Sequence, residues 1–155
     1  MNTLAVVLEK PLQLSLNRLD LCDATEDDVV VDIAWSGIST GTERLLWMGR
    51  MPQFPGMGYP LVPGYESVGR VRSAGSKSGM RVGDSVFVPG AKCFGDVRGL
   101  FGGAAATVVL PGARAIGFDP AFGEQGVLLA LAATALHVSS QAGGRARRGR
   151  RSGRD

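Results

Sequence analysis

The stretch SGISTGTERLLWMGRMPQFPGMGYPLVPGYESVGRV, residues 36–71, decides the fold of this chain. It places seven glycines among large apolar side chains, with four prolines between them. Glycine reaches backbone conformations that other residues avoid, whereas proline fixes one dihedral angle and removes a hydrogen-bond donor. This composition predicts a series of tight, shaped loops, and such loops often carry binding and catalytic residues.

Short apolar segments separated by turn residues lie on both sides of this stretch. Their alternation and β-branched content predict strands near residues 4–8, 12–16, 29–34, 69–73, 81–89 and 104–110. Many short strands with Gly and Pro between them are typical of a barrel. A helix is predicted over residues 123–138, which are rich in Ala and Leu and have Glu124 near the first turn. Residues 42–48 predict one short helical turn.

The motif SGIS…TE…YPLVPGYESVGRV resembles the medium-chain dehydrogenases/reductases, which commonly show a GIC…TD loop followed by a P…PGHE.(A/S)G.V loop. The resemblance runs from about Leu4 to about Val138. It implies a mainly β fold, the GroES-like, partly open β-barrel of the alcohol-dehydrogenase catalytic domain, with one C-terminal helix. It also implies a catalytic domain over residues 1–122, the start of a connecting helix over 123–138, and a missing Rossmann domain.

Within this superfamily the chain resembles the enzymes that use NAD to oxidise the 3-(1-hydroxyethyl) group of bacteriochlorophyllide a to acetyl during bacteriochlorophyll a biosynthesis. The resemblance therefore implies a tetrapyrrole substrate and, for the full-length family, a homodimer. Two alternatives stay open at this point. One is another zinc-free medium-chain alcohol dehydrogenase or quinone-reductase-like enzyme, and the other is a non-catalytic fragment with an Arg-rich tail that binds nucleic acid.

The zinc members of the superfamily take a Cys from the first loop and a His from the second. The matching positions here are Ser39, or Thr40 after a one-residue shift, and Tyr65. Because a hydroxyl and a phenol are poor zinc ligands beside thiolate and imidazole, we expect no zinc. Glu66 matches the Glu that follows the family His, and a single carboxylate does not bind zinc tightly.

Without a metal, oxidation of an alcohol needs a protein group that accepts the proton. The candidate catalytic residues are Ser39, Thr42, Tyr65 and Glu66. Each also has a purely structural interpretation, in which the hydroxyls shape a turn, Tyr65 packs in its loop and Glu66 pairs with an Arg or a backbone amide. These alternatives stay open from the sequence.

The remaining site residues concern the ligand and the cofactor. Apolar and aromatic residues in the loop suit a large flat ligand, and the predicted substrate-binding residues are Trp47, Met51, Phe54 and Tyr59, with core packing as the alternative. Thr40 and Thr134 are predicted to contact NAD, and for Thr134 the alternative is a hydrogen bond back to its own helix. A GxGxxG turn between a strand and a helix is absent from the sequence, so most of the NAD site is expected in the missing domain.

The last residues differ from the rest in composition. Residues 1–140 hold 11 Lys and Arg against 13 Asp and Glu, whereas residues 141–155 hold six Arg against Asp155. We expect residues 139–155 to be a disordered Arg/Gly tail, of the kind that GC-rich DNA encodes in a shifted reading frame, and the shortened chain to be inactive alone. The absence of an apolar run of roughly 18 residues predicts no membrane span, and only Cys22 and Cys93 are present, which suits a cytoplasmic protein.

Overall fold

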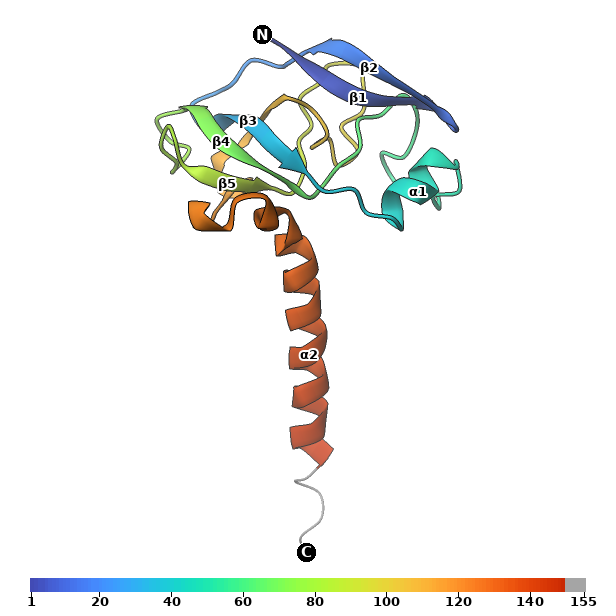
Figure 1. Ribbon diagram of the computed structural model, residues 1–155, viewed down its shortest axis with the longest axis vertical. Coiled ribbons are helices and arrows are strands. Elements are labelled where there is room, and N and C mark those ends of the chain that lie inside the picture. The colour runs from blue at the N-terminus through green and yellow to red at the C-terminus, as the bar shows by residue number, and fades with distance from the viewer. Residues whose placement is uncertain (150–155) are drawn as a thin grey trace, which may run out of the picture.

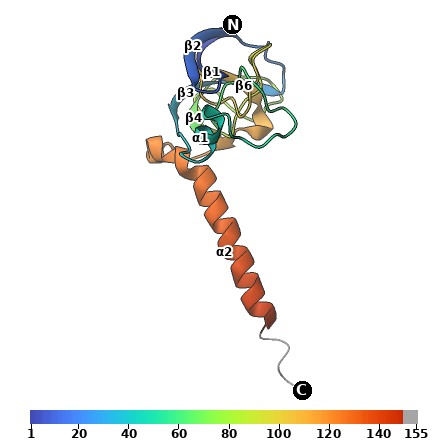
Figure 2. The same cartoon turned by 90° about the vertical axis from the view of Figure 1, so that its right-hand side faces the viewer.

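The computed structural model describes the backbone of residues 1–149 and the side chains of residues 1–140. A β-rich body carries a single long helix that extends away from it in both views of the molecule (Figures 1 and 2). The N-terminal strands lie at the opposite end of the body from this helix (Figure 1). The predicted fold class, mainly β with one C-terminal helix, is confirmed.

Two antiparallel sheets form the body. The first is the hairpin of β1 (Asn2–Lys10) and β2 (Gln13–Asp20). The second has the order β6-β3-β4-β5-β7. Its strands are β3 (Asp28–Ser36), β4 (Ser67–Ala74), β5 (Ser85–Val88), β6 (Thr107–Pro111) and β7 (Ile116–Gly117). The strands predicted from alternation therefore all exist, with bounds that differ by a few residues.

Backbone hydrogen bonds link the hairpin to the loops that close the barrel. The Val6 N–H donates to the Ala104 carbonyl at 2.9 Å, and the Ala106 N–H donates to the Leu4 carbonyl at 2.8 Å. A main core of valines and small residues fills the space between the sheets, including the fully buried Val29, Val31, Val86 and Val108. Short β-branched side chains suit this core because they pack closely on pleated strands.

Close approach of two strands explains Gly69. A Cβ at this position would lie 2.0 Å from the Asp32 carbonyl oxygen on the neighbouring strand β3. Only glycine leaves room for the β3–β4 contact there. The glycine-rich stretch thus serves strand packing as well as loop shape.

The segment between β3 and β4 crosses the end of the barrel. Helix α1 (Thr42–Trp47) lies in this segment and coincides with the short helical turn predicted over residues 42–48. A second, smaller core cluster holds this segment in place and consists of Leu8, Leu46, Leu61 and Leu100. Leu46 and Leu61 are fully buried, so α1 is anchored to the barrel through one face.

The C-terminal helix differs in extent from the prediction. A 3-10 helix, η2 (Pro120–Leu128), precedes the regular helix α2 (Leu129–Gly149). The interruption lies at Gly123, whose φ of 50° and ψ of −127° are not helical. Helix α2 continues past Val138 to Gly149, and residues 150–155 of the predicted tail lie outside the described residues. The proposed domain boundaries stay a prediction.

The segment Pro120–Ser140 is long and apolar enough to cross a bilayer, with a mean hydropathy of 1.3. Gly126 is the only residue of this segment that is buried against the rest of the chain. One such helix is weak evidence for a membrane span, because it meets the test by length and composition alone. The expectation of no span stays a prediction.

Candidate active site

Two hydrogen bonds connect Ser39, Thr42 and Tyr65, whose side chains we call the hydroxyl line, and so join the loop after β3 to the residues before β4. The Tyr65 hydroxyl donates to Thr42 Oγ1 at 3.2 Å, and the Thr42 backbone N–H donates to Ser39 Oγ at 3.3 Å. The ring of Tyr65 packs edge-on against Phe101, with centroids 5.1 Å apart and an interplanar angle of 63°. The structure therefore brings together three of the four predicted catalytic residues.

Glu66, the fourth predicted catalytic residue, lies next to Tyr65 and is only 6% exposed. Its backbone carbonyl accepts a hydrogen bond from the Gly37 N–H at 2.7 Å. Its Oε1 is buried and has no hydrogen-bond partner in the structure. The sequence-based alternative, in which Glu66 pairs with an Arg, is not what the described side chains show.

A second carboxyl group, that of Glu43 on α1, lies close to these residues. Its Oε2 is also buried without a hydrogen-bond partner. Burial raises the pKa of Glu43, and the negative charge of Glu66 raises it further, while backbone N–H groups of Glu43, Ser39 and Gly64 act in the opposite direction. The sequence analysis did not single out Glu43, although it occupies the acidic position of the TE motif.

An open cavity of about 730 Å³ lies between the β1–β2 hairpin and this loop. The hairpin contributes one apolar face, because Val6 pairs with Leu16 and Leu8 with Leu14 in the register of the two strands. The opposite wall comes from residues 36–40, from Glu43, Arg44 and Trp47 on or beside α1, and from residues 63–64 and 104–106. The cavity is thus mainly apolar, with a few polar groups along one wall.

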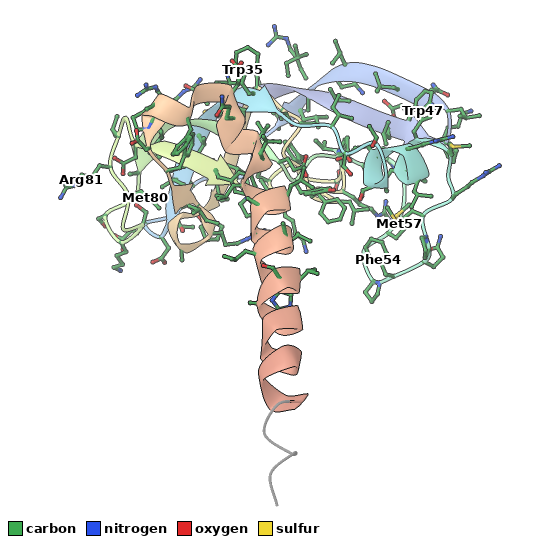
Figure 3. All side chains as sticks on the ribbon, turned by 60° about the horizontal axis from the view of Figure 1, so that its bottom comes forward. Trp35, Trp47, Phe54, Met57, Met80 and Arg81 are labelled. Atoms are coloured by element: carbon green, nitrogen blue, oxygen red, sulfur yellow. The ribbon has the colours of Figure 1, made fainter. Side chains whose placement is uncertain are left out.

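The four predicted substrate-binding residues lie in different environments in the structure. Trp47 lines the cavity, and Figure 3 shows it on one side of α1 with Phe54 and Met57 on the other. Met51 and Tyr59 pack against the second core cluster, where the Tyr59 hydroxyl donates to the Leu46 carbonyl. Met51 and Tyr59 thus pack as the core-packing alternative expects, Phe54 does not line the cavity, and the substrate-binding role of all four residues stays a prediction.

Alternation of Leu14 and Leu16 along β2 was the available signal for the hairpin wall of the cavity. Alternation predicts a strand with one apolar face, and it does not say whether that face meets the core or a ligand. In the structure both side chains are exposed, at 51% and 63%, and both line the cavity. Exposed leucines beside a hollow are a stronger indication of a binding surface than the alternation itself.

The two predicted cofactor contacts lie on different elements of the fold. Thr40 lines the cavity, whereas Thr134 is exposed on α2 and donates to the Ala130 carbonyl of its own helix at 2.9 Å. This is the local interpretation that the sequence left open for Thr134. Strand β3 leads through Gly37 and Gly41 into α1, but this turn lacks the GxGxxG spacing of a dinucleotide site, so most of the NAD site stays predicted outside the described residues.

A metal fits the site poorly as well. The residues at the family's zinc positions offer a hydroxyl from Ser39 and a phenol from Tyr65, with one carboxyl from Glu66 behind them. Over the part of the chain whose side chains are described, His, Cys, Asp and Glu form no group of three or more that could hold a metal ion. Because zinc favours thiolate and imidazole, zinc-free chemistry stays our prediction for this chain.

Comparison with known proteins gives the family. The alcohol dehydrogenase GroES-like domain family matches residues 25–120, the part of the chain that forms the five-stranded sheet and the loop side of the site. The chain belongs to this family. The sequence-based resemblance to medium-chain dehydrogenases is thereby confirmed.

Two curated members of the family are similar over nearly the whole chain. The 2-desacetyl-2-hydroxyethyl bacteriochlorophyllide A dehydrogenase of Rhodobacter capsulatus is 56% identical over 139 residues, which are 89% of this chain and 44% of the relative. The enzyme of the same name from Cereibacter sphaeroides is 54% identical over 143 residues, 89% of this chain and 45% of the relative. The chain therefore spans less than half of the length of these relatives.

Solved structures show the same fold. A short chain alcohol dehydrogenase from E. coli CFT073, complexed with NADH, matches 82% of this chain and 42% of its own with 25% identity and a TM-score of 0.64. The 2R,3R-butanediol dehydrogenase of Bacillus subtilis matches 81% of this chain and 43% of its own with 19% identity and a TM-score of 0.65. The β-body of this chain is thus the GroES-like domain of alcohol dehydrogenases.

Proposed function

We propose that this chain supplies the substrate-side part of a nicotinamide-dependent dehydrogenase that oxidises the 1-hydroxyethyl group of a bacteriochlorophyllide to acetyl. The observation that carries this proposal is the identity of 56% and 54% to two such enzymes over nine-tenths of the chain.

Oxidation of a secondary alcohol to a ketone removes one hydride and one proton. The nicotinamide supplies the hydride acceptor when it is bound, and its site is not formed by the described residues. The contribution of this chain therefore concerns the substrate and the proton. The Tyr65–Thr42 pair is the group that we assign to proton transfer, because a phenol and a hydroxyl in hydrogen-bond contact can exchange a proton without a metal.

The cavity suits the rest of such a substrate. A tetrapyrrole is large, flat and apolar, and the open trough of about 730 Å³ offers a wall of leucines opposite Trp47. Its polar wall carries Ser39, Thr40 and Glu43, which flank Thr42 in the chain, whereas Thr42 and Tyr65 are not among the lining residues. An alcohol at the edge of the macrocycle would meet the hydroxyl groups of Ser39 and Thr40 while the ring lies on the leucines.

A chimera tests this proposal directly. Residues 1–138 of this chain would replace the matching part of the Rhodobacter capsulatus relative, which supplies the rest of the enzyme. We expect the chimera to convert 3-hydroxyethyl bacteriochlorophyllide to the acetyl product with NAD. A folded chimera that binds NADH but does not turn over this pigment, while the parent enzyme does, would contradict the proposal.

The 155-residue chain alone is expected to be inactive in the same assay. Productive hydride transfer requires the substrate carbon and the nicotinamide carbon to lie about 3–3.5 Å apart, so the protein must hold both substrate and cofactor. The described residues hold the substrate side only. NADH formation by the chain alone at a rate near that of the chimera would show that a cofactor site exists in it after all.

A further inference from the structure

We propose that Arg44 binds a carboxylate on the ligand of the apolar cavity, so that the cavity selects a pigment with a free acid group over its ester. The inference rests on the proposed function for the identity of this ligand, because a bacteriochlorophyllide carries a free propionate on its macrocycle. The anion site itself is argued from the residues of this chain. Arg44 is thus a specificity-determining residue of the same cavity.

The lining of the cavity carries very little charge. Its hairpin wall consists of apolar side chains from β1 and β2. Among the described residues that line it, Glu43 and Arg44 are the two charged ones, and Arg44 is the one cation. In a mainly apolar site, a few polar groups fix the orientation of the ligand. A cation in this position favours a ligand in which one anionic group is attached to an apolar body.

The guanidinium group of Arg44 is exposed and has no partner among the described residues. Arg44 takes part in none of the ion pairs formed within residues 1–140. The neighbouring Glu43 does not take up this charge, because its carboxyl group interacts with backbone N–H groups of its own segment and of Gly64. The five N–H donors of the guanidinium are therefore available to a ligand.

Helix α1 holds Arg44 beside the aromatic wall of the cavity. Arg44 and Trp47 are three residues apart, which makes them neighbours on the helix surface, and both line the cavity. Leu46, which lies between them in the chain, is fully buried in the second core cluster and anchors the helix to the barrel. A flat macrocycle placed between Trp47 and Leu16 would therefore have Arg44 at its edge.

A carboxylate suits this site better than a phosphate does. The planar fork of a guanidinium matches the two oxygens of a carboxylate. One cation offsets one negative charge, and the nearby carboxyl groups of Glu43 and Glu66 disfavour a second negative charge on the ligand. The alternative role is that the stem of Arg44 covers apolar surface while its charge stays in water. In that role Arg44 would contribute equally to an acid and to its ester, so the difference between the two ligands decides.

The test is the binding to this chain of 3-hydroxyethyl bacteriochlorophyllide and of the methyl ester of its propionate, measured by quenching of tryptophan fluorescence. We expect the acid to bind about fivefold more tightly than the ester, near the upper limit for an ion pair that keeps contact with water. Arg44→Gln should abolish this preference. Arg44→Lys, which keeps the charge and loses the planar fork, should retain part of it.

Arg50→Gln is the matched control, because it removes the same charge from an exposed position outside the cavity and should leave the preference unchanged. Thermal unfolding of each variant checks that it is folded. Equal affinity of the native chain for acid and ester, or a preference that persists in Arg44→Gln, would overturn the role of Arg44 and leave the proposed function standing.

A second ligand separates this inference from the identity of the pigment. Pyrenebutyrate is a flat apolar ring system with one carboxylate, and its methyl ester again lacks the charge. The native chain should prefer pyrenebutyrate to the ester, and Arg44→Gln should lose that preference. If this result is obtained while the pigment does not bind, the carboxylate site stands and the proposed function is contradicted. If neither acid binds more tightly than its ester, the carboxylate site is overturned.

Discussion

Tyr65 and Thr42 are 23 positions apart in the chain, and the Tyr65 hydroxyl donates to Thr42 Oγ1 across 3.2 Å. The contact joins the start of α1 to the residue that precedes Glu66. Tyr65 is held from a second side by the edge-on contact with Phe101. The two contacts fix the ring of Tyr65 and hold its hydroxyl against Thr42, and a positioned hydroxyl is what proton transfer requires.

Tyr65→Phe in the chimera should therefore lower turnover roughly 100-fold or more, the usual contribution of a proton-transfer group, and leave KM nearly unchanged. Tyr59→Phe is the matched control. The Tyr59 hydroxyl donates to the Leu46 carbonyl inside the second core cluster, so its loss should cost about 1 kcal/mol of stability and little activity. Equal loss of turnover in both variants would assign the effect of Tyr65→Phe to packing.

Leu16→Ser should weaken pigment binding about fivefold, because it removes apolar surface worth about 1 kcal/mol from the wall of the cavity. Leu16 is already 63% exposed, so the free energy of unfolding should change little. Phe54→Ser provides the comparison, since Phe54 is exposed outside the cavity. Fluorescence titration with the pigment measures both. A larger loss of pigment affinity in Phe54→Ser than in Leu16→Ser would show that Phe54 contacts the pigment, as the sequence predicts.

Gly37→Ala should destabilise the chain by about 1–3 kcal/mol in denaturant unfolding, the cost of overpacking. The added Cβ would lie 2.8 Å from Glu66 Oε2 and 3.0 Å from Glu66 Cβ. Gly41→Ala is the matched control four residues later. Its Cβ would meet nothing closer than Ser39 Oγ at 4.0 Å, and its φ of −85° suits alanine. A neutral Gly37→Ala would show that the Glu66 side chain moves freely.

The two cysteines should differ in reactivity. Cys22 is exposed, whereas Cys93 is buried in the main core, where burial raises its pKa to about 11. At about pH 8 a thiol reagent should modify Cys22 in the native chain and Cys93 only after unfolding. Modification of one thiol in native protein and two in denaturant, measured by mass spectrometry, would match this expectation.

The same pKa predicts a pH dependence of stability. The folded thiol of Cys93 keeps its proton to a higher pH than the unfolded thiol, with an ordinary value of 9.0. Its contribution to stability is therefore complete below pH 9 and is lost as the pH rises from 9 to about 11. Unfolding measured in a Cys22→Ala background isolates this effect. Constant stability across that interval would contradict it.

Purified chain is expected to contain no stoichiometric zinc. Ser39 and Tyr65 offer oxygen ligands that zinc binds weakly compared with thiolate and imidazole. Elemental analysis after dialysis against a chelator measures the content. One tightly held zinc per chain, lost in Glu66→Gln, would show that Glu66 is a zinc ligand and would contradict this expectation.

The fold class and the family could be predicted from the order of the amino acids alone. Glycine and proline spacing in residues 36–71, together with short alternating strands, follows from local backbone preferences that act over a few residues. The hydroxyl and carboxyl candidates Ser39, Thr42, Tyr65 and Glu66 were likewise named from their positions in the motif. Such short-range patterns can be recognised in a sequence because the backbone preferences that cause them act over only a few neighbouring residues.

The burial and the contacts of those residues depend on the tertiary structure. Burial separated Tyr59, which packs in the core, from Trp47, which lines the cavity, although both lie in the same apolar loop. The pairing of β1 with β2 turned Leu14 and Leu16 toward that cavity. The buried oxygens Glu43 Oε2 and Glu66 Oε1, which have no hydrogen-bond partner, became evident only when distant segments were brought together. Solvent exclusion and the proximity of like charges depend on the whole fold, so no local pattern contains them.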